Sequence, residues 1–277
     1  MPTLPRAVLA MLAALCAAGC AGVPALPARD SLVDAERAFA RLSVERGLRE
    51  AFLASFADDG IAFEPGPVRL KEAWGARPAP ADPKAIELAW HPVVAGVARS
   101  GALGFTSGPF RLSDTTGRRP AVDGVYFSVW RRDGGGAWKV AIDAGIRTPI
   151  AVADDALKPD PIVGAASGPS RDGSLAAADA RASGAPASFE ESLAADARWH
   201  VDGRAPVIGK RAIARARGTE ARDARFVTLG SEAAASGDLG YTYGRRESDG
   251  APAGHYVHLW TREGDGDWRL VVAVDLE

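Results

Sequence analysis

Two carboxylates stand at positions where a protein could carry out acid–base chemistry. Glu64 follows a short apolar segment and precedes Pro65, and Asp143 ends the apolar segment that begins at Trp138. A carboxylate becomes an effective general acid or base when burial raises its pKa. Glu64 and Asp143 are therefore the candidate catalytic residues. Each also has a structural interpretation, Glu64 as an exposed turn carboxylate and Asp143 as an acceptor for a neighbouring backbone amide.

Histidine, cysteine and glycine patterns do not point to a metal or a cofactor. His255 and His258 are three residues apart in a predicted strand, so their side chains face opposite sides of a sheet. Both cysteines, Cys16 and Cys20, lie at the N-terminus, ahead of any predicted domain. No glycine-rich loop joins a strand to a helix in the manner of a phosphate-binding site. The sequence therefore predicts no metal site and no cofactor.

Aromatic side chains are the candidates for contacts with an apolar ligand. Tyr126 and Trp130 share one face of a predicted strand, as do Tyr256 and Trp260 in the second half of the chain. Such rows pack against other elements more often than they touch ligands. The predicted ligand contacts are Phe39, Phe52, Phe63, Trp74, Trp90, His91 and Tyr126.

The elements that must position these residues are organised around a pattern that occurs twice. Residues 100–108 read SGALGFTSG and residues 236–244 read SGDLGYTYG, and two further apolar segments follow each copy. Alternating residues and glycine-containing turns predict three successive antiparallel strands in each copy. A chain of 277 residues is long enough to form two domains with a core each.

Helices are predicted ahead of the strands in the first half. Apolar residues from Leu32 to Leu42 recur at helical spacing, and Ser31 precedes them as an N-cap. Glu36 is assigned to the polar face of this helix, which points away from the core. Gly47 is expected to end the helix, and a second short helix follows it.

The second half repeats this order with a weaker beginning. Its first helix, at residues 175–182, is broken early by Gly184 and Pro186. Val201 and Ala273 stand where the first half has its two candidate acids. We therefore expect any ligand site to lie in the first half and the second half to serve as structural support.

The order of elements predicts an α+β fold class, with two tandem domains in which helices pack on a curved antiparallel sheet. The domains are assigned to residues 31–149 and 174–277, with a linker rich in proline, glycine and alanine at residues 150–173. A net charge of −2 predicts no basic surface for nucleic acid.

The N-terminus carries a targeting signal. Arg6 precedes an apolar run, residues 7–18, and Ala17-Ala-Gly-Cys20 ends it, which resembles a bacterial lipobox with Cys20 as the lipidated residue. An ordinary signal peptide cut nearby is the alternative. We assign residues 1–20 to the signal and lipobox and residues 21–30 to a tether. The expected location is the periplasmic face of the bacterial cell envelope, on the outer membrane, with the lipid as the membrane contact.

Four segments of the first half carry a family resemblance: residues 57–66 (ADDGIAFEPG), 71–74 (KEAW), 100–108 and 124–143. They resemble the nuclear transport factor 2-like superfamily, in the branch related to SnoaL-like polyketide cyclases and ketosteroid isomerases. The resemblance covers residues 31–149 and implies a cone with an apolar pocket between helices and sheet, so we expect two tandem cone-like domains. Proteins of this superfamily often pair through the outer faces of their sheets. The resemblance therefore also implies that the two sheets pair within the chain, with the Tyr126 and Tyr256 rows near the contact. In ketosteroid isomerases the general base is an aspartate before a proline, a place that Glu64 occupies here. The donor tyrosine on their first helix has no match in this chain.

Three functions remain open at this point. The leading prediction is a lipid-anchored periplasmic protein that binds a small apolar molecule or a partner without catalysis. The first alternative is a cofactor-free lyase, isomerase or cyclase that uses a pocket carboxylate. The second alternative is a structural module of the envelope, because one fold can serve many functions.

Overall fold

A computed structural model describes residues 25–154, 175–183, 186–218, 225–248, 250–262 and 266–277. The predicted signal, Cys20, the start of the tether and linker residues 155–173 lie outside the described residues. Within the described ranges, no helix combines the length and the apolar character needed to cross a membrane. We call residues 25–154 the first half and residues 175–277 the second half.

The first half combines three helices with one sheet. The helices are α1 (Ala25–Arg46), α2 (Leu48–Ser55) and α3 (Leu70–Gly75). The strands are β1 (Phe56–Phe63), β2 (Pro67–Arg69), β3 (Ile86–Trp90), β4 (Val94–Val97), β5 (Leu103–Asp114), β6 (Val122–Arg132) and β7 (Trp138–Arg147). The strand order is β2-β1-β7-β6-β5-β3, and β4 also pairs with β5.

The second half has the same arrangement with shorter helices. The helices are α4 (Leu175–Ala182), α5 (Pro186–Ser192) and α6 (Lys210–Arg217). The strands are β8 (Leu193–Val201), β9 (Val207–Ile208), β10 (Arg225–Ala233), β11 (Leu239–Ser248), β12 (Ala251–Arg262) and β13 (Trp268–Leu276). The order β10-β11-β12-β13-β8-β9 is that of the first sheet read from its other edge. The α+β class and the three-stranded meander in each half are confirmed.

Each sheet is mixed, not antiparallel throughout. The short strand after the first two helices runs parallel to the last strand of its own sheet, β1 beside β7 and β8 beside β13. Parallel neighbours need a long connection. The whole meander supplies that connection here, which the expectation of an antiparallel sheet did not take into account.

Helix α1 begins earlier than predicted. It starts at Ala25, inside the expected tether, so Ser31 lies within the helix and is not its N-cap. Ala28 and Leu32 are both fully buried, which shows that packing extends the helix toward the N-terminus. The predicted end at Gly47 is confirmed. Gly47 has a φ of 92°, and a Cβ there would lie 2.3 Å from the carbonyl oxygen of Pro83.

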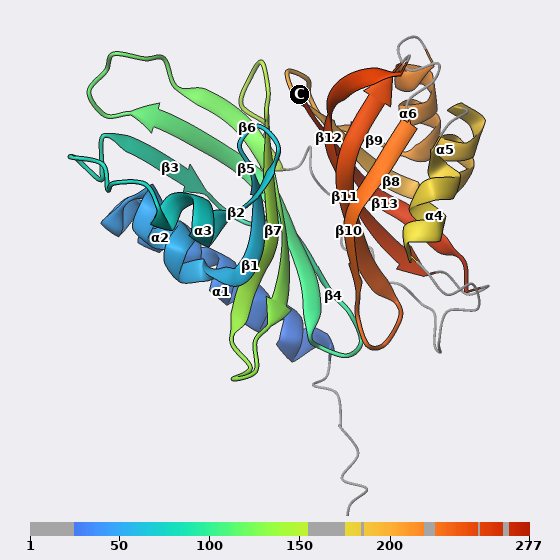
Figure 1. Cartoon of the computed structure of the whole chain (residues 1–277), viewed down its shortest axis with the longest axis horizontal. Coiled ribbons are helices and arrows are strands. Elements are labelled where there is room, and N and C mark those ends of the chain that lie inside the picture. Colours follow the sequence, from blue (N-terminus) through green and yellow to red (C-terminus); the bar gives the residue numbers. More distant parts are fainter. Residues whose placement is uncertain (1–24, 155–174, 184–185, 219–224, 249, 263–265) are drawn as a thin grey trace, which may run out of the picture.

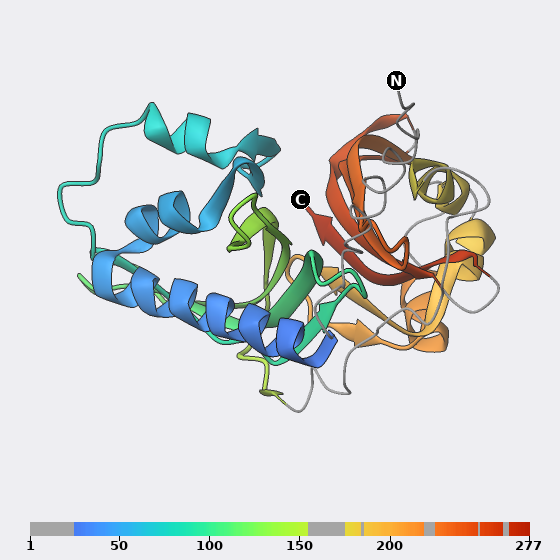
Figure 2. The ribbon, with the colours of Figure 1, turned by 90° about the horizontal axis from the view of Figure 1, so that it is seen from below.

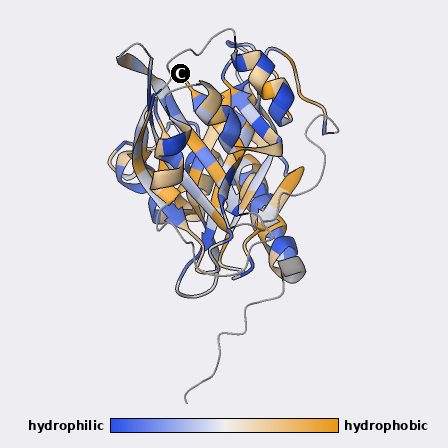
Figure 3. Ribbon diagram, turned by 90° about the vertical axis from the view of Figure 1, so that its right-hand side faces the viewer, coloured by the Kyte–Doolittle hydropathy of each residue, from blue (hydrophilic) through white to orange (hydrophobic). Residues whose placement is uncertain are grey.

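The two sheets lie between the two groups of helices. Figures 1 and 2 show α1–α3 on one side of the molecule and α4–α6 on the other. Apolar residues alternate with polar ones along the ribbons, and one continuous buried cluster contains residues of both sheets (Figure 3). At one end, the Arg99 amide donates to Asp238 Oδ2 at 2.9 Å. At the other, Arg147 Nε donates to Asp202 Oδ2 at 3.0 Å.

The predicted aromatic rows do not lie at the contact between the sheets. The Tyr126 ring lies 6.3 Å from that of Trp90, and Tyr256 donates a hydrogen bond to Asp179 on α4, so both tyrosines face the helices of their own half. The intervening residues, such as Phe127 and Val257, belong to the buried cluster that spans both sheets. The rows were expected on the face of each sheet that meets the other half. They lie instead on the opposite face, which the helices cover, so the expected position is wrong.

A bulge in β7 changes the expected face of Asp143. Trp130 pairs with Val140, but Val129 pairs with Ile142, so Ala141 is an extra residue in the ladder. Simple alternation along the strand would place Asp143 on the face away from Trp138 and Val140. The bulge instead brings Asp143 onto the concave face, beside its partner Ser128 on β6.

Candidate functional site

The centre of the first half is Glu36, whose side chain is completely buried. Glu36 lies four residues after Leu32 and three before Phe39 on α1, and these two neighbours are 0% and 3% exposed. It therefore belongs to the buried stripe of the helix. The assignment of Glu36 to the outward polar face is wrong. Its spacing from Leu32 and Phe39 was the signal that could have found it.

Three strands supply hydrogen-bond donors to the Glu36 carboxyl group. Trp90 Nε1 from β3 donates to Oε1 at 2.5 Å. Thr106 Oγ1 from β5 and Trp130 Nε1 from β6 donate to Oε2 at 2.5 Å and 2.9 Å. Both carboxyl oxygens are therefore satisfied by side chains, and two of the three donors are indoles.

Burial makes the two acids of the first half titrate near neutral pH. Desolvation raises the pKa of Glu36 from 4.5 to about 7, although the hydrogen bonds from Thr106, Trp90 and Trp130 lower it. The negative charge of Asp143 raises it further. Burial also raises the pKa of Asp143 from 3.8 to about 6, against the hydrogen bond that Ser128 Oγ donates at 2.6 Å. The pair can therefore hold or release a proton near neutral pH.

An aromatic cluster surrounds Glu36. The Phe39 ring lies 4.8 Å from Trp90 and 4.9 Å from Phe52, and Phe52 stacks on Trp74 at 5.3 Å. Tyr126 lies beside Trp90, and its buried hydroxyl has no hydrogen-bond partner among the described residues. The structure thus brings together five of the seven predicted ligand contacts.

The other predicted site residues lie elsewhere. The Phe63 ring is 6.2 Å from His255 of the second half, so Phe63 lies between the sheets. His91 is exposed, with its Nε2 2.8 Å from Asp154 Oδ1. Glu64 pairs with Arg77 at 2.7 Å and accepts a hydrogen bond from Trp74 Nε1, at the partly exposed edge of the aromatic cluster. Glu64 therefore lies at the rim and is not part of the buried acid pair.

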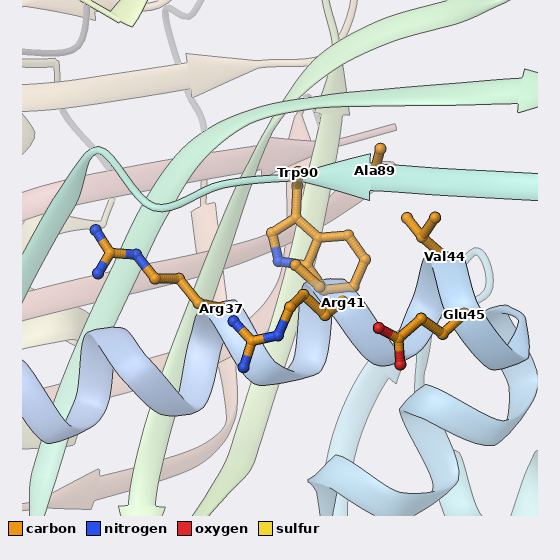
Figure 4. Close-up of a pocket in the computed structure, with 7 residues that line it drawn as sticks. Arg37, Arg41, Val44, Glu45, Ala89 and Trp90 are labelled. Carbon is orange, nitrogen blue, oxygen red and sulfur yellow. The ribbon is translucent and has the colours of Figure 1, made fainter.

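A groove between α1 and β3 reaches Trp90 from the surface (Figure 4). Its volume is about 350 Å³, and its lining residues are Arg37, Ala40, Arg41, Val44, Glu45, Ala89 and Trp90. Because the Trp90 indole also donates to Glu36, this side chain forms the wall between the groove and the buried acid. A second depression of about 250 Å³ is lined by Phe56, Ala57, Asp58, Asp59, Lys71, Arg131, Asp133 and Lys139. The buried acids line neither of them.

The second half has its own buried polar residues. Leu32 packs on Gly104 of the first sheet as Leu175 packs on Gly240 of the second, so Asp179 on α4 occupies the place of Glu36. Asp179 is fully buried and bonds to side chains of β10 and β12. The comparison at Val201 and Ala273 suggested that the second half had lost its polar groups, and that reasoning is wrong. Across the described residues, no cluster of histidine, cysteine or acidic side chains could hold a metal ion.

The chain resembles solved structures only at low sequence identity. An NTF2-like protein of unknown function from Pseudomonas putida shares 15% identity at a TM-score of 0.34, with 44% of this chain and 88% of that chain covered. A ketosteroid isomerase-like protein from Erwinia carotovora shares 15% identity at a TM-score of 0.33, covering 42% of this chain and 94% of that chain. A protein of unknown function with a cystatin-like fold from Nostoc punctiforme shares 17% identity at a TM-score of 0.35, covering 47% of this chain and 97% of that chain.

No family model matches the sequence, and no curated protein matches it. At these identities and TM-scores, the likeness to solved structures says nothing about what this protein binds or catalyses. The function must therefore be argued from the buried side chains themselves.

Proposed function

We propose that the first half binds a small, mainly apolar molecule that carries one polar group. The observation that carries this proposal is Glu36, a buried acid that accepts hydrogen bonds from two indoles inside an aromatic cluster. Ligand sites combine a mostly apolar lining with a few fixed polar groups. A ligand hydroxyl would replace an indole as the hydrogen-bond donor to Glu36, while its apolar body packs on the rings of Phe39 and Phe52.

In this proposal, the Trp90 side chain controls access from the groove to Glu36. It is only partly buried, lines the groove on one side and bonds to Glu36 on the other. A change of its rotamer would connect the groove to the acid. The groove volume of about 350 Å³ is at the lower end of the roughly 300–1,000 Å³ of ordinary ligand pockets, which suits a molecule of two fused rings.

The test compares 1-naphthol with naphthalene, which lacks the hydroxyl, by thermal shift and tryptophan quenching. We expect 1-naphthol to raise the melting temperature of the wild-type chain and to bind about tenfold more weakly to Glu36→Gln. Glu64→Gln is the matched control, because Glu64 lies at the rim, and it should bind like the wild type. Two results would refute the role of Glu36. One is that 1-naphthol and naphthalene bind the wild type equally well, and the other is that 1-naphthol binds Glu36→Gln as well as it binds Glu64→Gln. No binding at all would favour the structural module.

Cofactor-free acid–base catalysis is the second candidate. The specific observation in its favour is the pair formed by the buried Glu36 and the half-buried Asp143, with the pKa of Glu36 at about 7 and that of Asp143 at about 6. Groups with a pKa near the working pH are the most effective proton carriers. Turnover of a bound compound that disappears in Glu36→Gln while binding persists would replace the binding proposal with this one.

We further propose that Cys20 anchors the protein by lipid to the periplasmic face of the outer membrane. The support is the sequence of residues 17–20 and the apolar run before it. One acyl chain binds membranes weakly, and two or more give stable anchoring. Cys20→Ser should release the protein from the membrane fraction or leave it unprocessed. A wild-type protein that is soluble and carries no acyl mass would contradict the proposal.

We also propose that the two halves stay paired in solution. The hydrogen bonds at Asp238 and at Asp202, together with the shared apolar cluster, support this. A tethered partner has a high effective concentration, so modest contacts suffice. Small-angle scattering from the intact chain should fit one rigid particle, and a fit only to two independently tumbling halves would contradict the pairing.

A further inference from the structure

A second cluster of buried polar side chains lies inside the second half, between α4 and the concave face of its sheet. Asp179 Oδ1 lies 2.7 Å from His258 Nδ1, and Asp179 Oδ2 accepts hydrogen bonds from Tyr256 at 2.5 Å and Thr228 at 2.7 Å. Burial opposes ionisation of Asp179, but the hydrogen bonds and charge around it outweigh burial and lower its pKa. An ionised carboxylate only accepts, so His258 Nδ1 is the donor.

The other ring nitrogen of His258, Nε2, has no partner within the described part of the chain. His258 is 0% exposed, and its Nε2 makes no hydrogen bond with any described residue. Aromatic rings enclose the imidazole, with Tyr256 at 4.4 Å, Phe226 at 4.7 Å and Phe189 at 6.1 Å. An unpaired polar atom in such surroundings lowers stability unless something binds to it.

A second unpartnered atom belongs to the same interior. Asp275 is fully buried, and its Oδ2 accepts from Trp199 Nε1 at 2.8 Å and pairs with Arg246 at 2.9 Å. Its Oδ1 has no partner within the described part of the chain. Arg217, which also pairs with Asp275, stacks over Phe189 at 3.7 Å, the ring that lies near His258.

The strand register places His258 and Asp275 on the same face of the sheet. Asp275 pairs with Tyr256 and Ala273 pairs with His258, so all four side chains share the concave face. Ala273 stands where the first half has the longer Asp143, and His258 stands where it has the smaller Ser128. A planar apolar body bound against the aromatic rings could direct polar groups to both unpartnered atoms.

We propose that the second half is a separate ligand site for a small aromatic molecule with two hydroxyl groups. One hydroxyl bonds to His258 Nε2 and the other donates to Asp275 Oδ1. A hydroxyl both donates and accepts, so it suits Nε2 in either protonation state of the imidazole. Asp179 acts as a positioning residue that fixes the ring and leaves Nε2 as the binding atom.

The probe is resorcinol, with 1,3-dimethoxybenzene as the matched compound that has no donor. We expect resorcinol to shift the ¹⁵N resonance of His258 Nε2 in the intact chain, and the dimethyl ether to bind at least about tenfold more weakly. His258→Phe should abolish binding. Ala273→Val, which keeps every polar group and adds bulk beside His258, should weaken binding by a similar factor.

Glu36→Gln separates this site from the one proposed in the first half, because it should leave the resorcinol-induced shift of His258 Nε2 unchanged. Three results would overturn the proposal. They are an Nε2 resonance that saturating resorcinol does not move, an equal shift of that resonance by the dimethyl ether at the same concentration, and loss of the Nε2 shift in Glu36→Gln but not in Ala273→Val.

Discussion

Replacing Glu36 with glutamine should remove a large part of the pH dependence of stability. In the unfolded chain, this carboxyl group has its ordinary pKa of 4.5, whereas burial raises it to about 7 in the folded protein. One unit of pKa corresponds to about 1.4 kcal/mol, so the rise corresponds to about 3 kcal/mol. Glutamine keeps the shape of the side chain but does not titrate.

The sign of the effect follows from proton binding. Below about pH 4.5 both states hold the proton, and the contribution of Glu36 to stability is fully present. Between about pH 4.5 and 7 the unfolded chain releases the proton first, and stability falls. Above about pH 7 the folded protein holds a buried charge. The free energy of unfolding of the wild type, minus that of Glu36→Gln, should therefore fall by about 3 kcal/mol from pH 4.5 to 8.

Urea unfolding followed by circular dichroism at several pH values measures this difference. Taking the difference cancels the titrating groups that do not interact with Glu36, because they behave alike in both proteins. Glu45→Gln is the matched control for a glutamate-to-glutamine change on the same helix, since Glu45 is exposed. A carboxyl ¹³C titration should place the midpoint of Glu36 near pH 7. A flat difference for Glu36→Gln would show that water reaches this acid, and the argument for a sealed site would fail.

Three further variants test the surrounding structure. Asp143→Asn removes an acid whose pKa burial raises to about 6. Between about pH 4 and 6, the free energy of unfolding of this variant should therefore fall by about 1–3 kcal/mol less than that of the wild type. The carboxyl midpoint of Glu36 should also move to lower pH, because the negative charge of Asp143 is gone. Asp238→Ala leaves a backbone amide of the first half unpaired and should cost about 1–3 kcal/mol in urea unfolding, with a looser particle by scattering. Gly47→Ala should cost about 1–3 kcal/mol, because Cβ meets a carbonyl oxygen at positive φ. Gly117→Ala, at positive φ in open space, should cost less, and equal losses would contradict the steric argument.

The local elements could be predicted because their causes are local. Gly47 ends α1 and separates it from α2 since a positive φ there suits glycine alone. The three-stranded meander of each half follows from alternation and turn residues that lie within a few positions of one another. The parallel pairing of β1 with β7 could not be predicted from such local patterns. These strands are far apart in sequence, and the residues of one do not indicate which strand will pair with it.

The candidate sites were only partly visible. Phe39, Phe52, Trp74, Trp90 and Tyr126 were predicted as one group, and packing brings them together around Glu36. Glu36 itself was assigned to the polar face of its helix, and an unpaired charge is rarely buried. The free-energy cost of burying this carboxyl group is offset by hydrogen-bond donors that lie 54, 70 and 94 residues away in the chain. His258 was judged by its spacing from His255, and nothing in that spacing indicates Asp179 as its partner.

The sequence by itself determined the helices, the strand alternation and the small residues that allow close packing, because each depends on neighbours along the chain. Tertiary structure alone decided which polar groups are buried together. One extra residue in β7 moved Asp143 to the concave face. Folding placed Glu36 against two indoles and Asp179 against an imidazole. Burial of a charge depends on the summed hydrogen bonds and desolvation at one point in space, and residues from distant segments supply those terms.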